Sequence, residues 1–310
     1  MKIDNELVIH LAKELGFDLI GFAKVEQLKR EADNLTKWID NGFHAKMDYM
    51  TRNIEKRFDV TNILPTAKSV ISLGMNYYHP SKHSNKKNYG KVSRYAWGKD
   101  YHLIIWEKLE ELENQLKNIS PEFESKSYVD TGPVFDKIWA VKAGIGWQGK
   151  HSNVISREIG SWFFIASIIT NQEFDYNKIE NDFCGTCNAC IEACPTEAIV
   201  QPYVVDANRC ISYLTIENKN EIGEEFKGKF DGWLFGCDIC QDVCPWNKKF
   251  SFDSRIEDFH PVNKELNLDE VINLNEEEFK ERFETSPIKR AKLKGLKRNA
   301  LFLKRENESN

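Results

Sequence analysis

Residues 184–195 read CGTCNACIEACP, and residues 237–245 read CDICQDVCP. Cys210 lies between the two stretches and completes the eight cysteines of the chain. In both stretches successive cysteines are three or four residues apart, so a turn of chain directs their thiolates to the same side. The N-terminus lacks the apolar core of a secretion signal, and the reduced thiols of cytosolic proteins are metal ligands more often than disulfides. The two stretches therefore predict a metal-binding segment.

The spacing Cys-x2-Cys-x2-Cys-x3-Cys-Pro of the first stretch is the signature of bacterial ferredoxins with two 4Fe–4S clusters. In that signature the fourth cysteine binds the other cluster. The rule predicts one cluster on Cys184, Cys187, Cys190 and Cys244, and a second on Cys194, Cys210, Cys237 and Cys240. Zinc sites usually use two Cys-x2-Cys pairs, and a thioredoxin-like site uses one pair. The third equally spaced cysteine favours iron–sulfur over both, and two neighbouring clusters form an electron relay.

The cysteine-bearing segment is a small part of 310 residues, a length that holds about two domains. Runs of β-branched and aromatic residues predict strands, and apolar residues at three- and four-residue spacing predict a helix. The expected strands cover residues 18–25, 69–78 and 161–170, and the expected helix covers residues 101–119. We predict an α/β (α+β) fold in three parts: a catalytic part at residues 1–178, a ferredoxin-like part at 179–250 and a helical part at 251–310.

Charge is distributed unevenly along the chain, although the net charge is only −5. Residues 285–305 hold eight basic side chains and no acidic one. Such a segment is a candidate for contact with a polyanion, and the alternative is a solvated helix face. No apolar run approaches the roughly 20 residues that span a bilayer. We therefore expect a cytoplasmic protein without membrane contact.

Residues 144–150, GIGWQGK, satisfy the pattern G-x-G-x-x-G and imitate a Walker A loop. The dinucleotide fingerprint needs a preceding strand and an acidic residue about 20 positions later. Here a helix-like stretch precedes, and residues 165–170 contain no acidic residue. Walker A needs Ser or Thr after the lysine, and His151 follows Lys150. The loop is a better candidate for holding another large ligand through backbone N–H groups.

The residues from Asp100 to His102 begin like the D-x-H-x-x-G element that supplies an axial histidine in some cobalamin proteins. Ile105 occupies the position of the glycine, so the element is incomplete. We therefore interpret His102 as a surface residue of the predicted helix, and a bound cobalamin is expected to have no histidine ligand from the protein.

Several different short stretches, taken together and in their order along the chain, form a recognisable set. They are YMTRN at residues 49–53, KR at 56–57, SRYAWGKDYH at 93–102, YVDTGP at 128–133, AGIGWQGK at 143–150, CISYLTIE at 210–217, SPIKR at 286–290 and GLKRNA at 295–300. With both cysteine stretches, this set resembles the epoxyqueuosine reductases, the cobalamin- and iron–sulfur-dependent enzymes that complete queuosine in tRNA. The resemblance spans residues 45 to 300 and is more specific than any single stretch.

The resemblance implies a nitroreductase-like α/β domain that binds the corrinoid beside a two-cluster ferredoxin domain, similar to the core of reductive dehalogenases. It implies that Asp130 donates the proton to the leaving epoxide oxygen. Burial against Val129 and Val134 would raise the pKa of this carboxyl, as a general acid requires. The other positions that match corrinoid contacts are Arg57, Lys150, His151, Ser152, Val154, Ser212, Cys237 and Asp238. His151 departs from the asparagine usual in the family, and the helical-repeat domain of longer members is not expected here.

The implied partners are a tRNA that carries epoxyqueuosine and an external low-potential electron donor, with the chain itself acting as a monomer. Because such an enzyme needs phosphate contacts to position the anticodon stem-loop, Lys289, Arg290, Lys297 and Arg298 are the candidate tRNA contacts. Two alternatives remain: a corrinoid reductive dehalogenase, and an electron-transfer subunit without catalysis of its own. A basic segment and the absence of a twin-arginine signal favour the tRNA enzyme over the dehalogenase.

Overall fold

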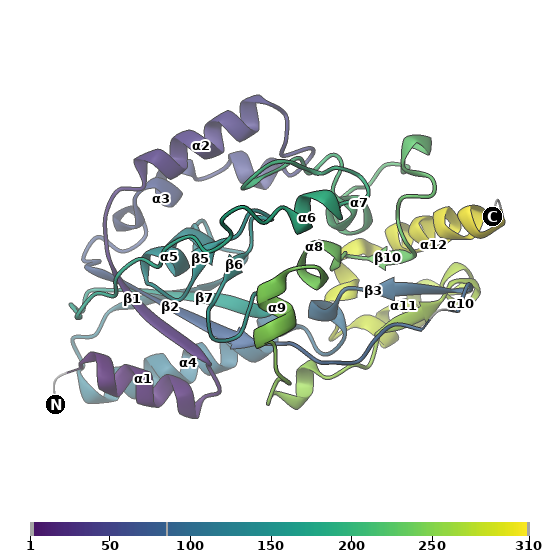
Figure 1. Ribbon diagram of the computed structural model, residues 1–310. Coiled ribbons are helices and arrows are strands. Elements are labelled where there is room, and N and C mark those ends of the chain that lie inside the picture. The colour runs from purple at the N-terminus through teal and green to yellow at the C-terminus, as the bar shows by residue number, and fades with distance from the viewer. Residues whose placement is uncertain (1–2, 85, 309–310) are drawn as a thin grey trace.

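A computed structural model describes residues 3–84 and 86–308 of the chain. Its central element is an antiparallel four-stranded sheet in the order β1-β2-β7-β4 (Figure 1). The strands are β1 (Leu19–Lys24), β2 (Ser69–Asn76), β7 (Phe163–Thr170) and β4 (Ser125–Val129). All eight residues of β2 are buried, because β2 lies between two other strands with helices on both faces. The strands predicted at residues 18–25, 69–78 and 161–170 are thus confirmed.

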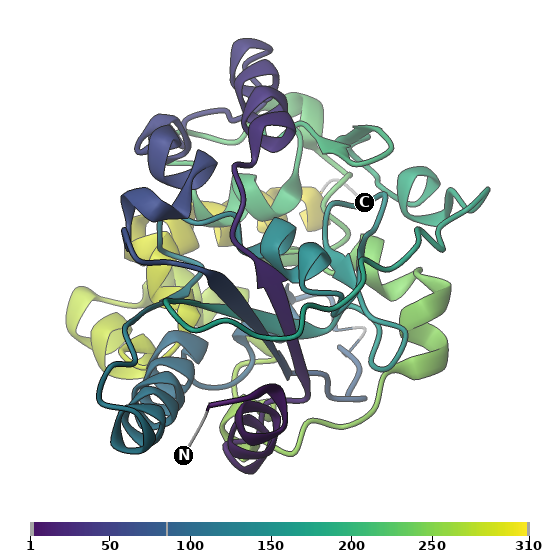
Figure 2. The same ribbon diagram turned by 90° about the vertical axis from the view of Figure 1, so that its left-hand side faces the viewer.

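Helices cover the two faces of this sheet (Figures 1 and 2). On one face lie α1 (Asn5–Glu14) and α4 (Tyr101–Ile119), and on the other lies α5 (Asp136–Lys142). The α4 helix has the predicted bounds, and its Asp100 side chain caps the first turn by accepting from the His102 N–H. The remaining helices of this part are α2 (Lys29–Asp40) and α3 (Ile54–Phe58).

A second, three-stranded sheet in the order β10-β3-β11 connects distant parts of the chain. Its strands are β3 (Tyr89–Val92), β10 (Trp233–Phe235) and β11 (Glu265–Asn267), with β10 parallel and β11 antiparallel to β3. Around it pack α7 (Ile211–Ile216), α10 (Leu268–Asn273), α11 (Glu276–Phe283) and α12 (Lys292–Glu308). One strand comes from each predicted segment, so this sheet crosses both predicted boundaries.

The cysteines lie on and around short elements beside the central sheet (Figure 1). Cys190 lies on α6 (Ala189–Glu192) and Cys240 on α8 (Ile239–Asp242), and the other cysteines lie in the loops around these helices, α9 (Pro245–Phe250) and the hairpin of β8 (Ile199–Gln201) and β9 (Val204–Val205). The glycine-rich loop lies next to them and forms the hairpin of β5 (Trp147–Gln148) and β6 (Val154–Ile155). In the described ranges, 3–84 and 86–308, no helix has the length and apolar character to cross a membrane.

Candidate active site and cluster-binding cysteines

Asp130 follows the last residue of β4 and adopts the left-handed backbone conformation, with φ of 56°. Aspartate tolerates this region better than most residues. Gly132 completes the turn, because a Cβ there would lie 2.1 Å from the Tyr128 ring. The turn leaves the Asp130 side chain 67% exposed. The expectation that valines would bury this carboxyl is therefore wrong, since the turn directs it away from the core into an open space.

Two side chains from the start of α4 reach the Asp130 carboxylate. The Tyr101 hydroxyl donates to Asp130 Oδ2 at 2.8 Å, and His102 Nε2 lies 3.8 Å from the same oxygen. The rings of Tyr101 and His102 stack at 4.1 Å. Burial, followed by the charge of Asp130, raises the pKa of Tyr101 far above its usual range, so the phenol stays a donor.

The same helix start orders His102 from its other side. Asp100 Oδ1 lies 2.8 Å from His102 Nδ1, and Lys289 Nζ lies 2.9 Å from Asp100 Oδ2. Burial would raise the pKa of Asp100, but hydrogen bonds from His102 and Lys289 lower it to about 2. The ionised carboxylate therefore accepts from Nδ1–H and leaves Nε2 facing Asp130. The interpretation of His102 as a surface residue is wrong, because its side chain is only 21% exposed.

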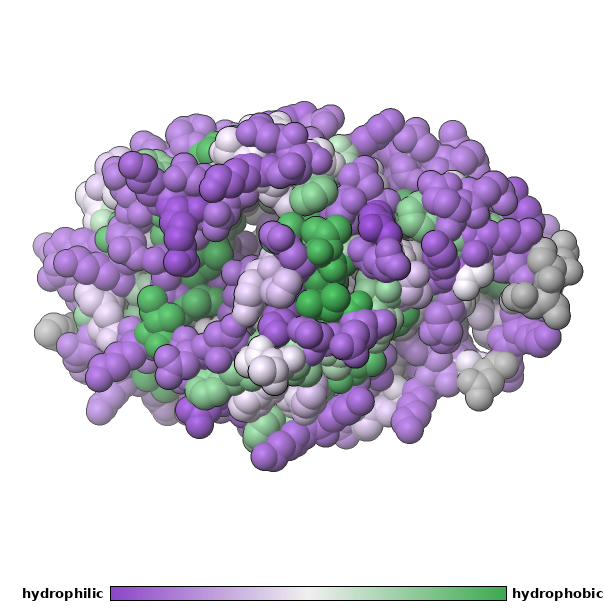
Figure 3. Space-filling view, turned by 45° about the horizontal axis from the view of Figure 1, so that its top comes forward, coloured by the Kyte–Doolittle hydropathy of each residue, from purple (hydrophilic) through white to green (hydrophobic). Residues whose placement is uncertain are grey.

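Charged groups continue from Asp130 along the start of α5 toward the loop at residues 150–154, and we call the space that these groups face the recess. Burial raises the pKa of Asp136 to about 7, against a hydrogen bond from Ser167 Oγ at 2.7 Å. Burial also lowers the pKa of Lys137, although this side chain reaches solvent. A group that is wet and still desolvated lies on the wall of a recess. Figure 3 shows a face of the molecule that is hollowed near its centre, with hydrophobic residues beside the hollow.

Of the residues predicted to contact a corrinoid, Arg57 and Ser152 lie nearest this wall. Arg57 Nη1 donates to the Val134 carbonyl at 3.4 Å, and its buried Nε finds no partner among the described residues. Burial lowers the pKa of this guanidinium. Lys137 Nζ donates to the Ser152 carbonyl at 3.1 Å. Val154 is buried in β6. The sequence interpretation missed Tyr101, Asp136 and Lys137, although Tyr101 stood in a stretch already singled out.

Lys150 is directed away from the recess, toward the first cysteine stretch. Its Nζ donates to the carbonyls of Gly185 and Cys187, at 2.8 and 2.9 Å, and to Asn188 Oδ1 at 3.1 Å. These three acceptors use all three protons of an ammonium group. The Lys150 side chain therefore holds the cysteine loop, so the prediction that residues 150–154 lie near a corrinoid can concern only the main chain at Lys150.

Four cysteines and His151 border one small cavity. Its lining consists of Lys150, His151, Ile155, Cys184, Cys187, Ala189, Cys190, Cys244, Pro245 and Trp246. The cysteines are the set that the crossing rule assigns to one cluster. His151 is only 5% exposed. Burial, then the charge of Lys137, lowers the pKa of His151 to about 4, so its ring is neutral near neutral pH. The prediction that His151 contacts a corrinoid fits poorly with this position.

The other four cysteines interact with one another in the same way. Burial raises the pKa of the Cys240 thiol, and the negative charges of Cys210, Cys190 and Cys194 raise it further. Burial followed by the charges of Cys240 and others raises the pKa of Cys237. Thiolates that repel one another strongly need a cationic centre between them to be stable. In the described ranges, no three His, Cys, Asp or Glu side chains converge closely enough to hold a single metal ion. A cationic cluster within each group would relieve this mutual repulsion.

Ser212 and Asp238 lie against this second group. Hydrogen bonds from the Ser212 main chain and hydroxyl lower the pKa of Cys210, which burial raises. Asp238 is fully buried, and it accepts from the Ser93 hydroxyl and from the Arg94 N–H at 2.8 Å. Its side chain is therefore not free for a corrinoid, which corrects that prediction. The Arg94 guanidinium lies 4.8 Å from the centroid of a Trp162 ring and joins Asp238 to the central sheet.

The basic residues near the C-terminus do not form one surface. Arg298 is buried and donates to the carbonyls of Leu214, Asn218 and Asn220. The prediction that it contacts tRNA phosphates is wrong, because a buried guanidinium cannot reach a polyanion. Arg290 is exposed and forms a two-bond pair with Glu217, at 2.8 and 3.2 Å. Lys297 is half-buried, and Lys289 pairs with Asp100.

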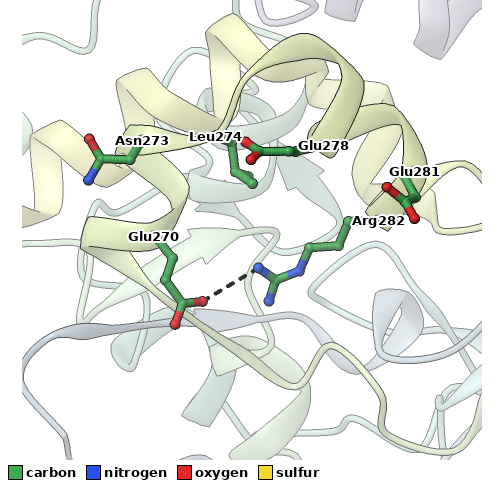
Figure 4. Close-up of a pocket in the computed structure, with 6 residues that line it drawn as sticks. All are labelled: Glu270, Asn273, Leu274, Glu278, Glu281 and Arg282. Atoms are coloured by element: carbon green, nitrogen blue, oxygen red, sulfur yellow. Dashed lines mark ion pairs between the residues drawn. The ribbon is translucent and has the colours of Figure 1, made fainter.

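A second depression lies between α10 and α11, outside this region (Figure 4). Its lining is Glu270, Asn273, Leu274, Glu278, Glu281 and Arg282. Arg282 Nη1 lies 3.5 Å from Glu270 Oε2, as the dashed line marks. These six residues include no cysteine and none of the predicted site residues, so the chemistry lies elsewhere.

Two groups of four cysteines beside a recess that holds a carboxylate, a phenol and a histidine define an iron–sulfur oxidoreductase. The family model described as "4Fe-4S double cluster binding domain" matches residues 183–247. The model described as "epoxyqueuosine reductase QueG, DUF1730" matches residues 57–131, which include the turn at Asp130.

The chain is similar to epoxyqueuosine reductases over nearly its whole length. The protein of Atelocyanobacterium thalassa is 44% identical over 96% of this chain and 97% of that protein. The protein of Leadbetterella byssophila is 47% identical over 94% of this chain and 96% of that protein. The chain belongs to the epoxyqueuosine reductase family, so the resemblance seen in the sequence is confirmed.

Solved structures of this family have the same fold. A crystal structure of epoxyqueuosine reductase with an epoxyqueuosine-modified tRNA-Tyr stem loop aligns with a TM-score of 0.92 at 34% identity, over 98% of this chain and 81% of that one. A structure of the Bacillus subtilis enzyme, whose catalytic aspartate loop is swung out of the active site, aligns with a TM-score of 0.89 at 32% identity, over 98% and 81%. The predicted mixed α/β fold with a double-cluster segment is confirmed.

Proposed function

We propose that this chain reduces epoxyqueuosine to queuosine in tRNA, at a cobalamin held in the recess beside Asp130. The proposal rests on family membership and on one observation, the contact of Asp130 with Tyr101 and His102. Opening an epoxide to an alkene and water takes two electrons and two protons. The chain places three proton-bearing groups where the leaving oxygen would be protonated.

The residues of the recess fit a large polar cofactor. Arg57 Nε is buried without a partner among the described residues, and Lys137 is exposed on the wall. The loop at residues 150–154 offers main-chain groups, with Ser152 in the left-handed conformation at φ of 68°. When bound and reduced, cobalamin supplies a strong nucleophile and electron donor toward the epoxide carbon. Arg57, Ser152 and the main chain near Val154 would hold it, in the nitroreductase-like part of the chain.

Asp130 gives the proton to the leaving oxygen in this proposal, and its neighbours restore it. Tyr101 donates to Oδ2 and keeps the carboxyl aimed into the recess. His102 can hold a proton at Nε2 and pass it to Asp130, because Asp100 accepts from Nδ1 on the other side. The second proton for the departing water can follow the same route. In this proposal, proton transfer from His102 keeps Asp130 supplied with a proton. The sequence had suggested that burial of the carboxyl would serve this purpose.

The positions of the two cysteine groups suggest the direction of electron transfer through the chain. Cys210 and Cys240 lie close enough to Lys137 for their charges to raise its pKa, against the burial that lowers it. The second cysteine group therefore borders the recess. Cys187 of the first group is exposed, so an external low-potential donor reaches the relay from that side.

The mouth of the recess carries groups suited to an RNA. Tyr49 is 42% exposed, and burial followed by the charge of Glu217 raises its pKa to about 12. An exposed phenol ring is a platform on which a splayed base can stack. Arg290 lies beside it and can bind phosphate once the anticodon loop displaces Glu217. The tRNA stem-loop is thus the proposed substrate, with the modified base above Asp130.

The test is anaerobic incubation of the iron- and cobalamin-loaded protein with a chemical reductant and one of two substrates. With tRNA containing epoxyqueuosine, nucleoside mass spectrometry should show loss of one oxygen atom. With an aryl halide, no halide should be released, and release without tRNA conversion would favour the dehalogenase alternative. A protein that binds iron but never retains cobalamin would favour the alternative of an electron-transfer subunit.

A further inference from the structure

The small cavity lined by the first cysteine group contains a buried N–H donor that the proposed reaction does not use. His151 Nε2 is buried and has no hydrogen-bond partner among residues 3–84 and 86–308. A buried donor without a partner costs about 1–3 kcal/mol. Such a group is retained where a partner outside the protein side chains and main chain satisfies it.

The protonated nitrogen of His151 follows from its other contact. The Asn153 N–H donates to His151 Nδ1 at 3.2 Å. Because Nδ1 accepts, the single proton of the neutral ring lies on Nε2. The ring therefore presents an N–H donor, and not a lone pair, to its surroundings, and His151 belongs to the lining of the cavity that Cys184, Cys187, Cys190 and Cys244 share.

The Lys150 ammonium group near this cavity already has acceptors. Lys150 Nζ donates to three oxygens of the loop at residues 185–188. Burial raises the pKa of the Cys184 thiol, while a hydrogen bond from the Lys150 main chain and the nearby Trp147 indole lower it. Trp147 Nε1 itself is buried without a partner among the described residues, so it is a second donor open to a cluster sulfur. The Lys150 bonds hold the loop at residues 185–188 against Lys150. His151, the next residue in the sequence, therefore faces the cavity beside this loop.

Neighbouring residues hold the His151 ring in place. A Cβ at Gly149 would lie 3.1 Å from His151 Cε1 and 2.6 Å from Ile155 Cδ1. Glycine at this position therefore leaves the space that the ring occupies. Lys137 bonds to the Ser152 carbonyl and to Asn153 Oδ1, which fixes the residue that donates to Nδ1. The donor is preorganised before any cluster is bound.

We propose that His151 Nε2–H donates a hydrogen bond to a sulfur of the 4Fe–4S cluster held by Cys184, Cys187, Cys190 and Cys244. Hydrogen bonds to cluster sulfurs stabilise the reduced, more negative state and raise the reduction potential. His151 is then a positioning and tuning residue of the first cluster. The inference rests on the proposed two-cluster function. The hydrogen bond from His151 makes this cluster easier to reduce.

The direct test uses wild-type protein labelled with ¹⁵N-histidine, anaerobically reconstituted and partly reduced. Pulsed electron paramagnetic resonance should detect a ¹⁵N coupling to one reduced cluster. His151→Phe should abolish this coupling and keep the packing of the ring. His260→Phe is the matched control, because His260 Nε2 already has the Ser254 carbonyl as its partner at 3.0 Å, and it should leave the coupling unchanged.

A redox titration gives the second readout. His151→Phe should lower the midpoint potential of one cluster by about 59 mV, a tenfold change in a one-electron equilibrium, and leave the other cluster unchanged. His151→Gln, which retains an N–H donor, should lower it less. If His151→Phe cannot retain its cluster, the coupling in wild-type protein still decides the matter.

Two results would overturn the inference: no ¹⁵N coupling in fully loaded wild-type protein, or a coupling that persists in His151→Phe. A protein that never binds about eight irons would instead defeat the two-cluster function itself. The two failures are therefore distinguishable by iron analysis of the same sample.

Discussion

Asp130 keeps its carboxyl in solvent at a backbone conformation that few residues other than glycine and asparagine favour. Such conformations cost about 1–3 kcal/mol and occur often at functional sites. The cost is offset where the turn must aim one side chain, and here it aims the carboxyl at Tyr101 and His102.

His102 is predicted to supply protons to Asp130. His102→Phe keeps the ring stacked on Tyr101 and removes the nitrogen facing Asp130. Turnover should fall by at least about tenfold, the lower part of the range for acid–base groups. The loss should deepen as pH rises, because free protons become scarcer. His10→Phe, on the exposed side of α1, should behave as wild type. A loss that is equal at every pH would contradict this role.

Asp136 is predicted to make stability depend on pH. Burial raises its pKa from 3.8 to about 7. Between these values the folded chain holds a proton that the unfolded chain lacks, so this residue's contribution to stability falls as pH rises toward 7. Asp136→Asn should therefore raise the melting temperature at pH 8 and change it least near pH 4. Thermal unfolding at the two pH values measures this. Equal melting temperatures of variant and wild type at pH 8 would refute it.

Among the elements, α12 carries most of the basic segment and shows why charge alone misled the sequence interpretation. Helix periodicity distributes its side chains around the axis, so some basic residues face the protein core. Arg298 is one of these, and its guanidinium fixes the C-terminal end of α7 through three carbonyls. The basic residues that remain outside lie in the turn before the helix and on its exposed face.

The buried and exposed basic residues should respond differently to alanine. Arg298→Ala leaves three carbonyls without a charged donor and should destabilise the fold by about 2 kcal/mol or more. Lys294→Ala, at an exposed position of the same helix, should change stability by less than about 0.5 kcal/mol. Denaturant unfolding measures both. Equal changes in the free energy of unfolding would mean that the hydrogen bonds of Arg298 do not stabilise the fold.

Binding to tRNA should depend on the basic residues that are not buried. Changing Lys289, Arg290 and Lys297 together to Ala should flatten the slope of log affinity against log salt by about two to three units, at ~0.7–0.9 per phosphate contact. Binding measured across a salt series tests this. A slope equal to that of wild type would return these residues to the solvated-face interpretation.

At the scale of the whole molecule, the sequence predicted the metal segment better than its surroundings. Cysteine spacing is a local pattern, so it predicted the double-cluster segment that the family model matches at residues 183–247, and Cys184, Cys187, Cys190 and Cys244 do line one cavity. Partners from distant segments, such as Asp100 with Lys289 and Lys150 with the loop at 185–188, have no local signal. The strand β3 pairs with strands from two later segments for the same reason. The strands of the central sheet and α4 were predictable because their apolar spacing is regular.

The crossing of the ligand sets gives a matched pair of variants. Cys194→Ala should damage the cluster that Cys237 and Cys240 bind, although Cys194 belongs to the first stretch. Cys244→Ala should damage the other cluster. Iron content and the spectra of the reduced variants distinguish the two. The reverse assignment, in which Cys194→Ala damages the cluster of Cys184, Cys187 and Cys190 and Cys244→Ala damages that of Cys237 and Cys240, would show that each stretch binds its own cluster.

The most direct test of the central claim is turnover of epoxyqueuosine-containing tRNA by Asp130→Asn. Asp231→Asn is its control, because Asp231 also has a positive φ, of 47°, and an exposed carboxyl. With both clusters and cobalamin loaded, wild type and Asp231→Asn should form queuosine at similar rates. Asp130→Asn should be slower by about two orders of magnitude or more. If fully loaded Asp130→Asn forms queuosine as fast as wild type, Asp130 is only a turn residue and the proposed site is wrong.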